Sequence, residues 1–128
     1  MGNLSVADDE WLARYILRKD HVRADGTVKP DPFIPFKHVE LSVTRHLGLS
    51  EPDLWAAGEA VATQVGAAMH GRADATVNVF VRQQLRVLSA PVAGNANHAN
   101  VVDWPPDKKS QKEIALLIAR DATFKLKV

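Results

Sequence analysis

Apolar and polar residues alternate along the stretch 37-KHVELSVTRHL-47. Its apolar side is formed by Val39, Leu41 and Val43. Its polar side is formed by His38, Glu40, Ser42, Thr44 and His46. Such alternation is the period of a β-strand with one buried face. The sequence therefore predicts a half-buried strand over residues 38–46.

A helix is predicted directly after this strand. Ser50 can cap its start, and Pro52 falls in the first turn, where its missing N–H costs nothing. One face of this helix would carry Leu54, Gly58, Val61 and Val65. Gly66 is suited to its C-terminal end.

The segment before the strand is predicted to begin with a second helix, over residues 6–19. The four-residue spacing of apolar residues favours this interpretation. The residues that carry it are Trp11, Leu12, Tyr15 and Ile16. The prolines of residues 23–37 have no N–H to donate to a neighbouring strand, so an extended connection is predicted there.

The C-terminal half is less regular. Residues 73–83 fit either a helix or a strand, and a strand is predicted over Leu85–Leu88. Residues 91–106 are predicted to form a long polar loop, which Trp104 anchors on the core. Such long irregular loops are often functional.

The chain closes with a predicted helix and strand. Asp107 or Ser110 can cap the helix, and Ser110 with Glu113 matches a capping box. In residues 123–128, apolar residues alternate with lysines, and this pattern predicts an edge strand. We therefore expect a single α+β domain over 1–128, in which a small mixed sheet of three to four strands is covered on one face by about three helices.

Composition narrows the class of protein. The chain has no cysteine, which excludes disulfides and thiolate metal sites. Its formal net charge of +1 argues against a dedicated binder of nucleic acids or membranes. Its start resembles no secretory signal, and no apolar run is long enough to span a membrane. We expect a cytoplasmic protein that needs no cofactor.

The polar side of the strand over 38–46 is the first candidate site. His38 and Glu40 are two residues apart, so they share one face of the strand. Such a pair could perform acid–base chemistry or bind a divalent metal. The alternative is that these side chains are the solvated face of an amphipathic strand.

Arg72 is the second candidate, in the stretch 70-HGRAD-74. A guanidinium presented at a turn could bind a phosphate or a carboxylate. The alternative is a structural ion pair with Asp74 or Asp53.

The polar loop and the helix after it supply the remaining candidates. The asparagines around His98 could offer amide groups to a ligand, or they could stabilise turns. They are Asn95, Asn97 and Asn100. His98 has no Glu or His at metal-ligand spacing in its loop, so no metal is assigned. Lys108 could help to bind an anion at a helix start, or it could be a solubilising lysine.

Four segments together resemble a group of small uncharacterised bacterial proteins. They are HVRADGTVKPDPFIP, ELSVTRHLGLSEPDLW, GRAD and NHANVVDWPPDK. The resemblance covers most of the chain and implies one intact domain in a bacterial, cytoplasmic setting. It implies no activity.

Two classes of function remain open. The first is a non-catalytic protein-interaction or accessory module that contacts another protein through residues 91–106. The second is a small metal-independent enzyme for a phosphorylated or nucleotide substrate. In the enzyme, His38 and His98 would be acid and base, and Arg72 and Lys108 would bind the anion.

Overall fold

The computed structural model describes residues 6–35 and 40–127. Its strands are β1 (Trp11–Ile16), β2 (Leu41–Arg45), β3 (Gly71–Thr76), β4 (Arg86–Ser89), β5 (His98–Val102) and β6 (Thr123–Leu126). Its helices are α1 (Glu51–Val65), α2 (Val77–Val81) and α3 (Lys108–Asp121), with short 3-10 turns η1 (Lys19–His21) and η2 (Asp31–Phe33) after β1. Within these described ranges, no helix has the length and apolar character needed to cross a membrane.

The strands form one antiparallel sheet in the order β4-β5-β2-β1-β3-β6. The prediction of an α+β fold with three helices is confirmed. The prediction of three to four strands in a mixed sheet is wrong, because the described residues form six antiparallel strands. The additional strands include β1 and β5, where the sequence predicts a helix and a loop.

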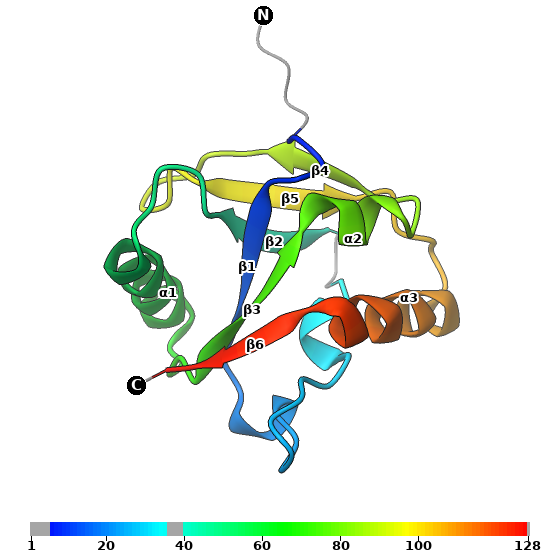
Figure 1. Ribbon diagram of the computed structural model, residues 1–128, viewed down its shortest axis with the longest axis horizontal. Coiled ribbons are helices and arrows are strands. Elements are labelled where there is room, and N and C mark those ends of the chain that lie inside the picture. Colours follow the sequence, from blue (N-terminus) through cyan, green and yellow to red (C-terminus); the bar gives the residue numbers. More distant parts are fainter. Residues whose placement is uncertain (1–5, 36–39, 128) are drawn as a thin grey trace, which may run out of the picture.

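The helices cover both faces of the sheet, whereas the sequence predicts one covered face. Along β1, Leu12 and Ile16 belong to the core that α2 and α3 cover, and Ala13 and Tyr15 pack with Ala62 of α1. Figure 1 shows α1 on one side of β1 and β3, and α2 and α3 on the other side. We call the two sides of the sheet the α1 face and the α3 face.

This double covering explains why the predicted helix over 6–19 is wrong. A spacing of four residues fits a helix, but it is also a multiple of the two-residue period of a strand. Trp11 and Tyr15 therefore share one face of β1, and Leu12 and Ile16 share the other. An apolar strand between two cores has the same pattern as an amphipathic helix.

The predicted loop over 91–106 is wrong for a different reason. Its middle forms β5, which pairs with both β4 and β2. Only Ala99 and Val101 of β5 are fully buried, and alanine is a weak strand signal. Trp104 does anchor the following segment, since it is buried and its Nε1 donates to the carbonyl oxygen of Val101 at 3.0 Å.

Several local predictions are confirmed. β2 lies within the predicted strand, whose first residues, 38 and 39, lie outside the described residues. Ser50 caps α1 by accepting a hydrogen bond from the N–H of Asp53, and Gly66 ends α1 with a positive φ of 70°. β4 matches the strand predicted over Leu85–Leu88 to within one residue, and β6 is the predicted edge strand.

Two boundaries of helices and strands could be assigned only from the structure. The ambiguous residues 73–83 divide between β3, which ends at Thr76, and α2, which begins at Val77. Asp107 caps α3 by accepting a hydrogen bond from the N–H of Ser110 at 2.9 Å. Ser110 therefore lies inside the helix, and the predicted capping box of Ser110 and Glu113 is wrong.

Candidate functional site

Arg72 is buried in a cluster of charges on the α1 face. Its side chain has no exposed surface, and its Nε donates to both carboxylate oxygens of Asp74, at 3.0 and 3.1 Å. Its Nη2 donates to Glu51 Oε1 at 2.6 Å, and its guanidinium lies 4.7 Å from the ring centroid of Trp55. The structure therefore places Arg72 in the ion-pair role with Asp74, away from solvent.

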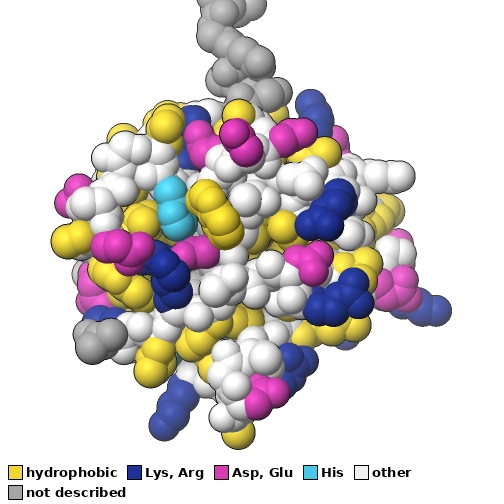
Figure 2. Space-filling model, viewed as in Figure 1, with side chains coloured by type: hydrophobic (Ala, Val, Ile, Leu, Met, Phe, Trp, Pro, Cys, Tyr) yellow, Lys and Arg dark blue, Asp and Glu magenta, His cyan; other side chains and the backbone are white. Residues whose placement is uncertain are grey.

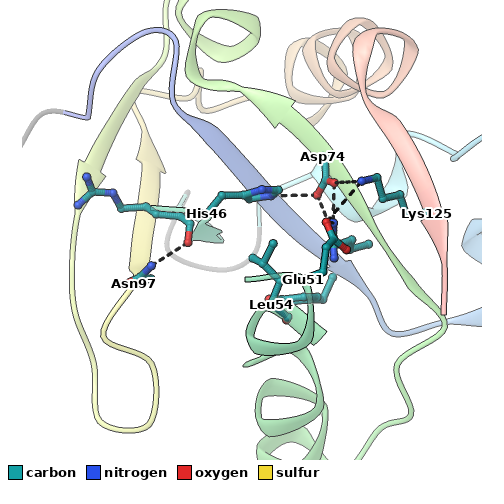
Figure 3. Close-up of polar contacts among 9 residues, drawn as sticks. His46, Glu51, Leu54, Asp74, Asn97 and Lys125 are labelled. Atoms are coloured by element: carbon teal, nitrogen blue, oxygen red, sulfur yellow. Dashed lines mark hydrogen bonds and ion pairs between the residues drawn. The ribbon is translucent and has the colours of Figure 1, made fainter. Parts of the chain in front are cut away.

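Other elements extend this cluster, as Figure 3 shows. Asp74 Oδ1 also lies 3.1 Å from His46 Nε2, just after β2, and Lys125 of β6 lies 3.6 Å from Glu51 and 3.9 Å from Asp74. The hydrogen bond from Arg72 holds the pKa of Glu51 below its usual range. We call these five residues the ion cluster. It ties the start of α1 to β2, β3 and β6.

The ion cluster borders a shallow hollow of about 270 Å³, which Trp11 and Thr123 also line. In the view of Figure 2, one histidine lies among acidic and basic side chains, with hydrophobic surface beside it. The sequence pairs Arg72 with Asp74 and places His46 on the polar side of the first candidate strand, but it gives no role to Glu51 or Lys125. The two-residue spacing of Arg72 and Asp74 and the alternation of the strand over 38–46 suggest parts of this cluster, but not that they meet.

A second and larger hollow lies on the α1 face, beside the C-terminal half of α1. We call it the α1 groove; it has a volume of about 440 Å³. Its polar lining includes Arg14, Tyr15, Thr44, Gln64, Asn95 and His98. Its apolar lining includes Leu17, Val61, Val65 and Val92. The groove therefore combines a few polar groups with an apolar wall, as ligand sites commonly do.

Of the two histidines predicted as acid and base, His98 lies in the described residues, and it lines the α1 groove. Its Nδ1 lies 2.7 Å from the carbonyl oxygen of Ala90, across the β4–β5 hairpin. Because a carbonyl oxygen only accepts, this contact requires a proton on Nδ1. In the neutral ring, Nε2 is then an acceptor that is free for a ligand. His38 lies outside the described residues.

The asparagines mainly hold the β4–β5 hairpin against β2. Asn95 Nδ2 donates to Thr44 Oγ1 at 2.9 Å, and Asn97 Nδ2 donates to the carbonyl oxygens of Arg45 and Leu47, at 2.9 and 2.7 Å. Asn100 is on β5, in register with Ser42 and Leu88. Of the three, only Asn95 lines the α1 groove. The turn-stabilising role predicted for them as an alternative fits Asn95, whose Oδ1 accepts a hydrogen bond from the N–H of Asn97 at 3.1 Å.

The remaining candidates do not meet at one site. His98 lines the α1 groove, whereas Arg72 is buried in the ion cluster and does not line that groove. Lys108 is exposed at the start of α3, on the opposite face of the sheet. Within residues 6–35 and 40–127, no group of three or more His, Asp or Glu residues is placed to hold a metal ion.

The sequence gives no role to Arg14, which bridges a break in the sheet. β1 and β2 pair only at Leu12 with Arg45 and at Ala13 with Thr44. Beyond these pairs, Arg14 Nη1 donates to the carbonyl oxygen of Ser42 at 3.1 Å, and its Nε donates to that of Pro32 at 2.7 Å. An arginine in a strand has no local signal for such a role.

No family model, curated protein or solved structure was found to match the chain. The function must therefore be inferred from the geometry of the site.

Proposed function

We propose that this chain is a non-catalytic interaction module that binds a segment of a partner protein in the α1 groove. The observation that carries the proposal is the apolar rim of that groove. Val65, at the end of α1, and Val92, in the β4–β5 hairpin, both line the groove, yet they are 64% and 49% exposed. Covering such side chains contributes about 25 cal/mol per Å² of buried apolar surface.

The rim also indicates the size of the occupant. A small molecule inside the groove would leave the outer parts of Val65 and Val92 in water. A polypeptide segment that crosses the groove would cover both side chains and fill the space between them. The hairpin tip lies close to the end of α1, because a Cβ added at Gly94 would lie 3.2 Å from the side-chain nitrogen of Gln64.

The net charge of the chain is consistent with a protein partner. The formal net charge is +1, without the basic excess typical of proteins that bind nucleic acids. The resemblance to small bacterial proteins adds a bacterial, cytoplasmic setting to the proposal.

The proposal can be tested by photo-crosslinking in cells. A photoreactive amino acid at position 65 or 92 should crosslink to the same partner, whereas one at position 116 should not. Leu116 is a matched control, because it is an exposed apolar side chain, 52% exposed, on α3 at the opposite face. Absence of a crosslink from positions 65 and 92, or an equal crosslink from 116, would refute the proposal.

A small enzyme remains the second candidate, and the fixed ring of His98 favours it. A histidine whose Nδ1 is bound to a carbonyl oxygen has Nε2 available as a general base. Arg72 and Lys108 are not at the groove, so Arg14 would have to bind the substrate anion. A substrate whose turnover is abolished by His98→Gln, while its binding persists, would favour the enzyme over the interaction module.

A further inference from the structure

The α1 groove contains a cation that has no acidic partner in the described chain. Arg14 is half-buried, and its recorded partners are the carbonyl oxygens of Pro32 and Ser42, which carry no net charge. Desolvation by the surrounding chain lowers the pKa of Arg14 to about 10, still high enough to keep it charged near neutral pH. A bound anion would compensate this charge.

The rest of the groove is also suited to an anion. None of its lining residues in the described chain is an aspartate or a glutamate. By contrast, Arg45 is bound to Glu10, and Arg72 is bound to Asp74 and Glu51. Asn95 and Gln64 add side-chain amide donors to the lining.

From these observations we propose that the α1 groove recognises the C-terminal residue of a partner protein, one with an apolar side chain. Its carboxylate would bind Arg14, and its side chain would pack on the valines of the wall. Within about 440 Å³, the anion and the apolar group must be close together. A C-terminal apolar residue carries both groups on one Cα, whereas an internal aspartate or glutamate has no apolar branch.

This inference rests on the proposed function, and a titration of the unmodified protein separates the two. The probes are N-acetyl-leucine, which mimics the end of a chain, and N-acetyl-leucinamide, which differs only in its neutral amide. Backbone amide signals of Gln64, Val65 and Asn95, followed by NMR, report on binding in the groove. The free acid should bind at least about tenfold more tightly than the amide, the difference expected for hydrogen bonds to a charged group.

Two variants test whether Arg14 causes the preference for the free acid. Arg14→Gln keeps a side-chain donor but removes the charge, so it should abolish the preference for the acid and leave amide binding unchanged. Arg86→Gln is the matched control, because Arg86 is an exposed arginine on β4 that is already paired with Asp103. This control should retain the full preference. If Arg14→Gln does not fold, the comparison of acid with amide on the unmodified protein still decides.

Each outcome has a defined meaning. Equal binding of acid and amide in the groove would overturn the carboxylate inference and leave the interaction module standing. No shift of the groove signals with either probe would also overturn the inference, and crosslinking from positions 65 and 92 would then decide the proposed function separately. Tighter binding of 4-methylpentanoate, which has the carboxylate and side chain but no peptide group, would overturn recognition of a chain end.

Discussion

The side-chain amide of Asn95 donates a hydrogen bond of 2.9 Å to the hydroxyl of Thr44, and both residues line the α1 groove. This bond joins the tip of the β4–β5 hairpin to β2. It therefore fixes one wall of the groove relative to its floor.

Asn95→Ala should loosen that wall. Thr44 is buried, so the loss of its partner should cost about 1 to 2 kcal/mol of the free energy of unfolding, measured by urea denaturation. Asn100→Ala is the control and should cost less, because no side-chain hydrogen bond of Asn100 is recorded among the described residues. Equal costs for the two variants would show that the bond to Thr44 does not hold the hairpin.

Removing Asp74 from the ion cluster should destabilise the protein far more than removing Glu51. Asp74 is buried, so Asp74→Ala leaves the buried charge of Arg72 without its main partner and should cost about 3 to 5 kcal/mol. Glu51 is largely exposed, so Glu51→Ala should cost much less than Asp74→Ala. Chemical denaturation of both variants tests this difference. Similar costs would mean that Asp74 does not anchor Arg72.

Gly58 controls how closely α1 approaches the sheet. A Cβ at this position would lie 2.3 Å from the sulfur of Met69 and 2.6 Å from the ring of Tyr15. Replacing glycine with alanine usually stabilises the interior of a helix. Here Gly58→Ala should instead destabilise the protein by about 1 to 3 kcal/mol, because α1 must move outward. A raised melting temperature would contradict the packing described for this face.

Because the hydroxyl of Tyr15 is buried, we expect the protein to lose stability at alkaline pH. Burial raises its pKa to about 12, and its hydroxyl donates to the carbonyl oxygen of Leu54 at 2.6 Å. The unfolded chain loses this proton near pH 10. The contribution of about 2 to 3 kcal/mol is thus complete below pH 10 and is lost as the pH rises towards 12. Tyr15 is the single tyrosine of the chain, so phenolate absorbance reports on it alone. An ordinary titration near pH 10 in the folded protein would refute this.

The sequence predicts the elements that carry local signals. β2 has clean alternation, α1 has Ser50 and Gly66 at its ends, and β6 alternates with lysines. β1 is mistaken for a helix because a central strand that is buried on both faces loses its alternation. Whether such a strand is covered on one face or on both is decided by distant helices, which local periodicity does not report.

The candidate site was predictable only in part. His98 is identified from its unusual polar surroundings in the sequence, and it does line the α1 groove. Arg14, which also lines the groove, comes from β1 and reaches it only because β1, β2 and β5 are arranged in one sheet. Arg72 looks available in the sequence, but burial beside Asp74 and Glu51 makes it structural. Convergence of distant residues is a property of the topology.

We expect a partner protein to cover the rim of the α1 groove, which Val65 and Val92 form. The most direct measurement is the affinity of the crosslinked partner for the double variant Val65→Gln with Val92→Gln, compared with Leu116→Gln. The affinity should fall at least about tenfold for the double variant, because two apolar contacts are removed, and it should stay the same for Leu116→Gln. An unchanged affinity of the double variant would show that no partner covers this rim.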